Sequence, residues 1–217
     1  MAAIYVDLDG TLLQYDRSFG DIFDEACETV GVAATDEYRH YYVTQFFDRF
    51  TAFDDDPFLA AARDLCREFD LDVDPVVFRD ARVDAERAAT TVAPGARAAL
   101  DSLERDHRLG VLSNGVGSVQ RDKLAAHDLD DVFDAIVVSH DVGAMKPDSR
   151  LFTTAARRLP ADEHVYVGDS AEDDIGGAVE AGWAKTVHVV APTSDCPECR
   201  ADLHVAPDEF DRIGEIL

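Results

Sequence analysis

The sequence predicts the α/β class, a doubly wound parallel sheet into which an all-helical segment is inserted. Between residues 92 and 190, short apolar segments alternate with helical patterns, as in parallel sheets that helices cover on both faces. One further apolar strand lies near the amino terminus, and the long segment that follows it is helical throughout. Ordinary crossovers are much shorter than this segment. We therefore expect a core of residues 1–13 and 91–217, with residues 14–90 as an inserted helical domain.

The first strand is predicted at residues 4–7, an apolar run with β-branched residues that Gly10 follows closely. It delivers two carboxylates, Asp7 and Asp9, into the turn beyond it. Carboxylates this close repel each other, and desolvating either one without a partner costs several kcal/mol. The pair therefore indicates a nearby cation or a division of catalytic roles. A helix-capping Asp followed by a turn Asp is the purely structural alternative.

The inserted segment contains four helical patterns of apolar residues. The third is expected to begin at Pro57, because proline is favoured in the first turn of a helix. The aromatic residues between Tyr38 and Phe53 form a helical stripe, which we interpret as the core of a helix bundle. One or two of these rings could also line a substrate pocket, since pockets often lie at domain interfaces.

Four further strands alternate with helices in the second part of the chain. The expected strands span residues 109–112, 133–139, 165–167 and 186–190, and the expected helices span residues 94–106, 118–127, 149–158 and 175–181. Polar residues follow the carboxyl ends of several of these strands. Ligands of doubly wound sheets bind at that edge, so we expect the polar residues to face one crevice.

The polar residues expected in this crevice combine acids, a hydroxyl, an amide and a lysine; they are Asp7, Asp9, Ser113, Asn114, Lys146, Asp169, Asp173 and Asp174. Clustered carboxylates need a hard divalent cation, and their oxygen ligands suit Mg²⁺. A hydroxyl, backbone N–H groups and a lysine are the groups that bind a phosphoryl group. Lys146 is one of only three lysines in the chain, which points to a specific task for a compact ammonium group.

The chain is strongly acidic, with a net charge of −25 from 33 Asp and 12 Glu against 17 Arg and 3 Lys. The acids are spread over every segment, which indicates adaptation to a salty cytoplasm, where screening weakens self-repulsion. This halophilic composition argues against nucleic-acid or anionic-membrane binding. The sequence also lacks an apolar run of about 18 residues and a signal-like amino terminus, so we expect a cytoplasmic protein without membrane spans.

The four cysteines fall into two groups. Cys27 and Cys66 lie in apolar helical patterns and are expected to be small core residues. Cys196 and Cys199 have the spacing of half a zinc site, with His188 or His204 as possible partners. No second Cys pair accompanies them, and an ordinary loop is the favoured interpretation.

Four of these segments, in this order, resemble the four motifs of the haloacid dehalogenase-like (HAD) hydrolase superfamily. The matching segments are Asp7-Leu8-Asp9-Gly10-Thr11, Ser113-Asn114-Gly115 with Gln120 and Lys123, Lys146-Pro147, and Gly168-Asp169-Ser170 through Asp174-Ile175-Gly176-Gly177-Ala178 with Ala181-Gly182-Trp183. The first and fourth segments are the specific ones. The resemblance implies a Rossmann-like core, and the helical insert looks like the family's mobile cap.

The resemblance also implies roles for individual residues. Asp7 would be the nucleophile that forms an aspartyl-phosphate, and Asp9 would act first as general acid and then as general base. Mg²⁺ would be bound by a carboxylate oxygen of Asp7, the backbone carbonyl of Asp9 and the Asp169 side chain. Ser113 and Lys146 would bind the phosphoryl oxygens, with Asn114 assisting. Asp174 would bind the metal through water or orient Lys146, and Asp173 is the competing candidate for that role.

The expected function is therefore Mg²⁺-dependent hydrolysis of a small phosphorylated metabolite. A 2-haloacid dehalogenase is less favoured, because such an enzyme needs neither the metal nor an acid at the position of Asp9. A phosphomutase would use the same residues and keep the phosphate. A non-catalytic binding module on the same core is a further alternative, which an incomplete set of acids would favour. The sequence names neither the substrate nor the oligomeric state.

Activity is expected to require high salt as well as Mg²⁺, because counterions screen the repulsion within so acidic a chain. The measurement is the rate of p-nitrophenyl phosphate hydrolysis in Mg²⁺ at increasing KCl. Full activity in low salt would contradict the halophilic interpretation.

Overall fold

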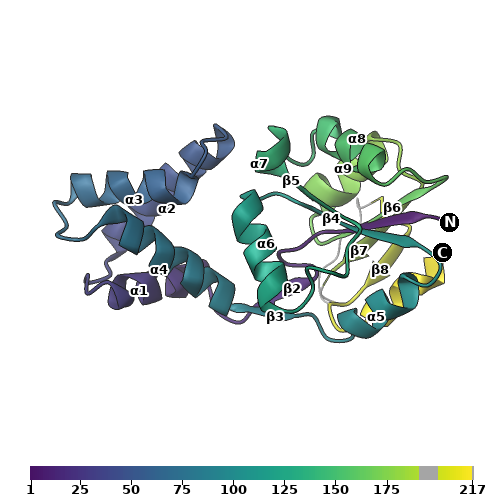
Figure 1. The fold of residues 1–217 in the computed structure, drawn as a ribbon, viewed down its shortest axis with the longest axis horizontal. Helices are drawn as coiled ribbons and strands as arrows, with labels where there is room; N and C mark the ends of the chain where they lie inside the picture. Colours follow the sequence, from purple (N-terminus) through teal and green to yellow (C-terminus); the bar gives the residue numbers. More distant parts are fainter. Residues whose placement is uncertain (191–199, 217) are drawn as a thin grey trace. The chain divides into compact units, whose positions relative to one another are not determined.

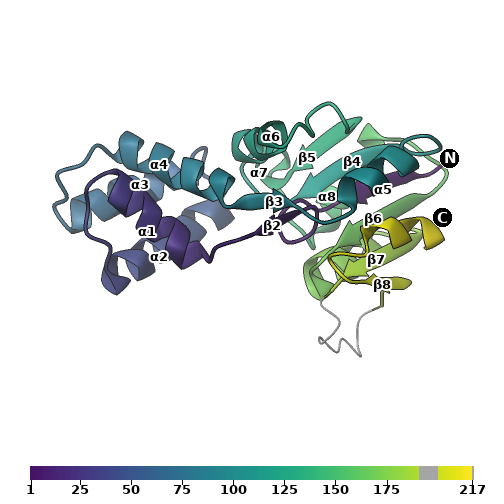
Figure 2. The same ribbon diagram turned by 90° about the horizontal axis from the view of Figure 1, so that it is seen from below.

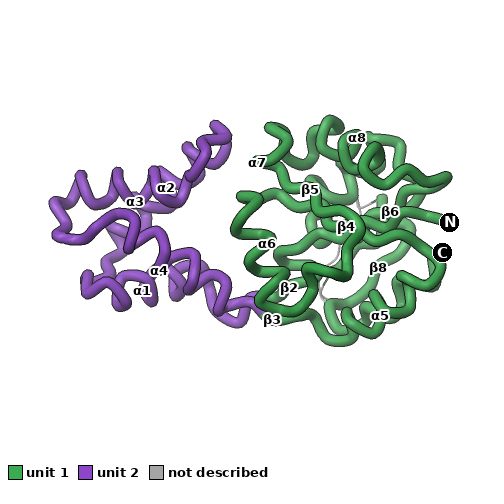
Figure 3. The backbone as a smooth tube through the Cα atoms, in the orientation of Figure 1, with its two compact units in different colours: residues 1–14, 91–217 green, residues 15–90 purple. Residues whose placement is uncertain are grey.

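The computed structural model describes residues 1–190 and 200–216, and these divide into two compact units. One unit consists of residues 1–14 and 91–217, and the other of residues 15–90 (Figures 1 and 3). The first unit contains a six-stranded sheet, whereas the second contains four helices. Cys196 and Cys199, the half zinc site considered above, lie outside the described residues.

The sheet of the first unit is wholly parallel in its described pairings. Its strands are β1 (Ala3–Val6), β4 (Arg108–Ser113), β5 (Ala135–Val138), β6 (His164–Gly168), β7 (Lys185–Val189) and β8 (Leu203–Val205). They are arranged in the order β5-β4-β1-β6-β7-β8. The chain therefore builds outward from β1 first on one side and then on the other, which confirms the predicted doubly wound fold.

Helices cover both faces of this sheet (Figure 2). Alternate residues of β1 point to opposite faces, as the period of a strand requires: Ile4 and Val6 belong to one apolar cluster, whereas Tyr5 belongs to the other. The first cluster includes side chains of α5 (Ala96–Leu103), α6 (Gly117–Ala126) and the 3₁₀ helix η2 (Phe210–Ile216), and the second those of α7 (Ser139–Val142), α8 (Ser149–Arg158) and α9 (Gly177–Glu180).

The helical unit contains α1 (Phe19–Thr29), α2 (Asp36–Thr51), α3 (Pro57–Glu68) and α4 (Pro75–Ala88). Helix α3 begins at Pro57, as predicted, and the Asp56 carboxylate caps it by accepting a hydrogen bond from the backbone N–H of Leu59. The aromatic stripe lies on α2, where Tyr42 is buried with Phe23 and Phe78 in the core of the unit. The expected core role of this stripe is thus confirmed at Tyr42, whereas Phe47 on the same helix is exposed.

The same environment accounts for the two described cysteines. Cys27 and Cys66 are both buried and both free, as their apolar helical patterns predict. Burial raises the pKa of the Cys27 thiol to about 11, because an apolar surrounding disfavours the thiolate. These cysteines are therefore small core residues and not reactive nucleophiles.

Several features of the fold differ from the sequence-based expectation, among them the unpredicted helices α7 and η2. Strands β2 (Leu13–Tyr15) and β3 (Thr90–Val92) pair into a short two-stranded sheet at the ends of the inserted segment. Strand β8 extends the main sheet beyond the last predicted strand. The helix expected at residues 175–181 begins earlier, with a π-helix, η1 (Ala171–Gly176).

In the described part of the chain, no helix is both long and apolar enough to cross a bilayer.

Gly110 is expected to be needed for the packing of β4 against β1. These strands pair with Tyr5 opposite Gly110, and a methyl group at Gly110 would overlap the buried Tyr5 ring. Gly110→Ala should lower the free energy of unfolding by ~1–3 kcal/mol, as overpacked core substitutions do. Thermal unfolding measures this difference. Gly214→Ala is the matched control, because its added carbon would meet no atom within 4 Å beyond the adjacent backbone, and an equal loss in both variants would contradict the packing argument.

Candidate active site

Asp7 follows the last residue of β1, at the carboxyl edge of the sheet. Its backbone N–H donates to the carbonyl oxygen of Val167 in β6 at 2.8 Å, which continues the sheet pairing for one more residue. The chain then turns back through hydrogen bonds from Leu13 N–H to Leu8 O and from Gly10 N–H to Leu13 O, each 2.8 Å long. The predicted strand end and turn are thus present, and the turn presents a buried carboxylate.

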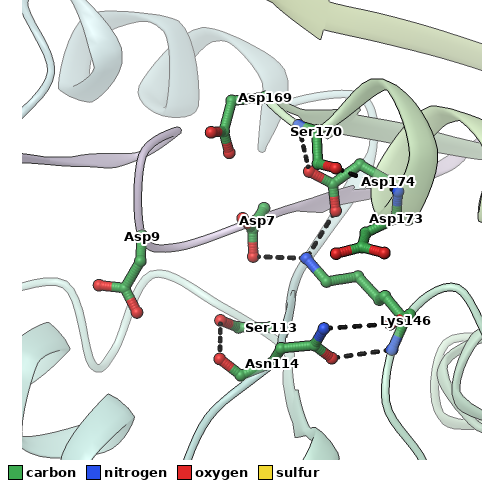
Figure 4. A pocket seen from close by; sticks show the side chains of 9 residues that line it. All are labelled: Asp7, Asp9, Ser113, Asn114, Lys146, Asp169, Ser170, Asp173 and Asp174. Carbon is green, nitrogen blue, oxygen red and sulfur yellow. Dashed lines mark hydrogen bonds and ion pairs between the residues drawn. The ribbon is translucent and has the colours of Figure 1, made fainter. Parts of the chain in front are cut away.

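Lys146 places an ammonium group directly beside Asp7. Its Nζ atom lies 2.8 Å from Asp7 Oδ1 and 2.6 Å from Asp174 Oδ1 (Figure 4). It also donates to the Tyr166 hydroxyl at 3.0 Å. The lysine is 4% exposed. The two carboxylates raise the pKa of Lys146 against the opposing effect of burial, so the group stays charged in this site.

Asp169 and Asp174 enter the site from the end of β6 and from η1. Asp174 Oδ2 accepts from the backbone N–H of Ser170 at 2.9 Å, and Asp169 Oδ1 accepts from the Thr11 hydroxyl at 2.9 Å. Gly10 has a φ of +85°, and an added Cβ would lie 2.6 Å from Asp169 Oδ2. Glycine is therefore required at this turn, both for its backbone conformation and for the approach of Asp169.

Asp174 and Asp173 differ in their surroundings. Oxygen atoms of Asp7, Asp169 and Asp174 all lie within 4.8 Å of one another. Asp173 lines the same pocket but does not belong to this group. Its backbone N–H donates to the Ser170 hydroxyl oxygen at 3.0 Å. The geometry thus favours Asp174 over Asp173 as the second acid of the fourth motif.

The acids of the site carry more charge than Lys146 neutralises. Three carboxylates face one ammonium group. Burial raises the pKa of Asp7 to about 8, and the neighbouring Asp174 and Asp169 add to this effect while Lys146 opposes it. Burial and Asp174 likewise raise the pKa of Asp169. The site therefore favours either protonation or a bound cation.

The residues present fit a hard divalent cation. Among the described side chains, Asp7 Oδ1 is a buried oxygen without a hydrogen-bond donor, because the contact with Lys146 has ion-pair distance but not hydrogen-bond geometry. The donor set consists of carboxylate oxygens alone, the ligands that Mg²⁺ prefers. Asp7, Asp169 and Asp174 are the side chains that could hold it. The Asp9 side chain is not a member of this group, and metal binding by its backbone carbonyl stays a prediction.

Ser113 and Asn114 lie at the end of β4 and line the same pocket, which has a volume of about 210 Å³. The Asn114 side chain is directed to the backbone of Lys146: its Nδ2 donates to the carbonyl oxygen at 3.2 Å, and its Oδ1 accepts from the N–H at 2.8 Å. In this structure Asn114 thus positions the Lys146 loop. Phosphate binding by Ser113, Asn114 and Lys146 remains a prediction.

Asp9 occupies the other side of the pocket. Figure 4 shows its carboxylate pointing away from Asp169 and Asp174. Oδ1 accepts from Lys123 Nζ at 2.9 Å and Oδ2 from Gln120 Nε2 at 2.7 Å. The sequence interpretation assigned no role to Gln120 or Lys123. The available signal was their spacing of three residues, which places both on one side of a helix, and the rarity of lysine in the chain.

In the absence of metal, Asp7→Asn is expected to stabilise the protein at alkaline pH. The folded-state pKa of Asp7, about 8, exceeds the unfolded value of 3.8, so its contribution to stability is lost as pH rises from about 4 to 8. Removing the charge should raise Tm in EDTA at pH 8 by about 3 °C or more, the shift that ~1 kcal/mol produces in a chain of this size. Thermal unfolding at several pH values checks this.

The gain in Tm should shrink toward pH 5, where Asp7 is protonated in the folded protein. Asp101→Asn, a substitution of an exposed carboxylate on α5, is the matched control and should show no such pH dependence. A Tm difference between Asp7→Asn and the wild type that is the same at pH 5 and pH 8 would contradict the raised pKa of Asp7 in the folded protein.

Known proteins resemble this chain in sequence and in fold. Over 134 residues, it is 31% identical to the Escherichia coli pyrimidine 5'-nucleotidase YjjG, a match that covers 58% of this chain and 60% of that protein. Over 116 residues, it is 36% identical to the glyceraldehyde 3-phosphate phosphatase of Methanopyrus kandleri, covering 52% of this chain and 49% of that protein. The chain thus spans less than two thirds of these relatives.

A crystal structure of a HAD phosphatase from Thermococcus onnurineus shares the fold over 100% of this chain and 97% of that one, with a TM-score of 0.72 and 24% identity. At this sequence identity, the structural similarity supports the same fold and nothing further. A sequence comparison identifies the family: residues 1–182, which include every residue that lines the pocket, match the family model of haloacid dehalogenase-like hydrolases. The chain therefore belongs to the haloacid dehalogenase-like hydrolase family.

Proposed function

We propose that this protein is a Mg²⁺-dependent phosphatase that hydrolyses a small phosphate monoester through an aspartyl-phosphate. The observation that carries the proposal is the pairing of Asp7 with a buried Lys146 inside a pocket that is also lined by Ser113 and four further carboxylates. An anionic ester needs cationic and hydrogen-bonding groups around it. The names of the two sequence relatives described above, a nucleotidase and a phosphatase, support this class of substrate.

In the proposed first step, a carboxylate oxygen of Asp7 attacks phosphorus while Asp9 gives a proton to the departing alcohol oxygen. Lys146 and the Ser113 hydroxyl bind phosphoryl oxygens as charge develops on them. In the second step a water oxygen bonds to phosphorus and its proton passes to Asp9, while the bond between Asp7 and phosphorus breaks. Mg²⁺, when bound by Asp7, Asp169 and Asp174, would neutralise the charge of the nucleophile and the phosphoryl group.

The helical unit, residues 15–90, is proposed to serve as the cap of this active site and to select the substrate. Its enclosed aromatic core and its insertion directly after the first motif support the proposal. A pocket of about 210 Å³ in the sheet unit suits a phosphoryl group and its metal, so the rest of the substrate would be recognised elsewhere. The same proposal includes a small phosphorylated metabolite as the substrate, a cytoplasmic location and adaptation of the protein to high salt.

A dehalogenase is disfavoured by Asp9, a pocket-lining acid that accepts hydrogen bonds from two donors, and by the carboxylates of Asp169 and Asp174. A phosphomutase shares the proposed first step and differs in the acceptor of the phosphoryl group. Release of inorganic phosphate from a monoester by water identifies a phosphatase, whereas release of chloride from 2-chloropropionate in EDTA would identify a dehalogenase.

The test is hydrolysis of p-nitrophenyl phosphate in high salt, with Mg²⁺ or EDTA. Asp7→Asn should lower kcat by about 10³-fold or more, because it removes the nucleophile. EDTA should abolish turnover by the wild type, and Asp101→Asn should retain it. Equal turnover by Asp7→Asn and the wild type would overturn the proposed mechanism, and undiminished turnover in EDTA would overturn the metal requirement.

A further inference from the structure

Lys123 is a buried ammonium group that the proposed reaction has not used. It lies in the last turn of α6, and its side chain is 1% exposed. Its Nζ atom is 2.9 Å from Asp9 Oδ1. Burying an ammonium group costs several kcal/mol unless a partner compensates, and a hydrophobic residue of similar volume often serves stability as well. Stability alone therefore does not explain a lysine here.

Gln120, one helical turn earlier, engages the same carboxylate. Its Nε2 donates to Asp9 Oδ2 at 2.7 Å and to the Ser113 hydroxyl oxygen at 2.9 Å. A side-chain amide has two N–H hydrogens, so it can make both bonds at once. Gln120 is 2% exposed, and an added Cβ at Gly115 would lie 2.7 Å from its amide. The packing thus leaves the Gln120 side chain little room to turn.

Together, these contacts engage both oxygens of the Asp9 carboxylate from one helix face. The Ser113 hydroxyl oxygen accepts from Gln120, so its hydrogen points elsewhere. In this structure the hydroxyl donates to the Asn114 carbonyl oxygen in a long contact of 3.4 Å. The acid and the hydroxyl that line the pocket are therefore connected through a single amide. This arrangement sets the direction of the Asp9 carboxylate and places the Lys123 ammonium group beside it. It also sets the direction in which the Ser113 hydroxyl can donate.

We propose that Gln120 and Lys123 are positioning residues, which direct Asp9 for proton transfer and stabilise the carboxylate that it becomes. This inference rests on the proposed phosphatase function. As the bond between phosphorus and the ester oxygen breaks, the Asp9 proton moves to that oxygen, and the Asp7 oxygen bonds to phosphorus. Negative charge then develops on Asp9, beside the Lys123 ammonium group. Water later attacks phosphorus and returns a proton to Asp9, while the phosphorus–Asp7 bond breaks.

A stabilising contact to a charge that develops during proton transfer accelerates that step selectively. The rate gain from this contact depends on the leaving group. p-Nitrophenolate departs readily without a proton, whereas the departure of phenolate depends more strongly on protonation. The test therefore compares kcat/KM for p-nitrophenyl phosphate and phenyl phosphate, two esters of similar shape. The ratio of the two values, measured on one preparation, does not depend on the fraction of protein that is folded.

Lys123→Met should lower kcat/KM for phenyl phosphate about ten-fold or more beyond its effect on p-nitrophenyl phosphate, a part of the 10²–10⁴-fold typical of general acid catalysis. Asp9→Asn should shift the ratio in the same direction and further. Lys123→Arg, which keeps the charge, should restore part of the ratio. Gln120→Met should shift the ratio and also raise the inhibition constant of inorganic phosphate, because Ser113 loses its direction.

Lys185→Met is the matched control, since this lysine lies in the first position of β7 and donates to the Ile216 carbonyl oxygen; its ratio should equal that of the wild type. An unchanged ratio in Lys123→Met, with the wild type active and Asp7→Asn inactive, would overturn the positioning role and leave the phosphatase proposal intact. Loss of activity toward both esters in equal measure would also overturn it. A wild type that hydrolyses neither ester would count against the phosphatase function itself.

Discussion

Crowding of carboxylates at the end of β1 is the constraint on which this active site depends. Asp7, Asp169 and Asp174 share a space in which their oxygens approach within 4.8 Å, with one ammonium group among them. Such crowding is unfavourable unless charge is compensated, and the surrounding chain is shaped to maintain it. Gly168, for example, leaves room for Asp174, whose side chain would overlap a methyl group at that position. The repulsion among these carboxylates indicates that the site is shaped for binding its ligands more than for the stability of the fold.

Much of the fold, and the residues that line the pocket, could be predicted from the sequence. Apolar strand segments and the polar residues after them placed Asp7, Ser113 and Asp169 at one sheet edge, because parallel strands of a doubly wound sheet share that edge. Lys146 was singled out by its rarity. These residues do line one pocket, although their chemical roles remain to be tested.

Other features depended on tertiary geometry that no local pattern records. The π-helix η1 decides that Asp174 and not Asp173 joins the carboxylate group, since its wider turn changes which side chain points inward. Phosphate binding by Asn114 stays a prediction, and no local pattern indicated the pair of hydrogen bonds between its amide and the backbone of Lys146. The short strands β2 and β3 pair only because residues distant in sequence meet.

Two of the three lysines each lie against one of the two first-motif acids, Lys146 against Asp7 and Lys123 against Asp9, and both are almost fully buried. The third, Lys185, donates to a backbone carbonyl. Reagents that acylate lysine side chains would therefore find Lys185 as the accessible target, while the other two react only when the pocket opens. Acylation of Lys123 and Lys146, followed by peptide mapping, would thus record the opening of the site in solution.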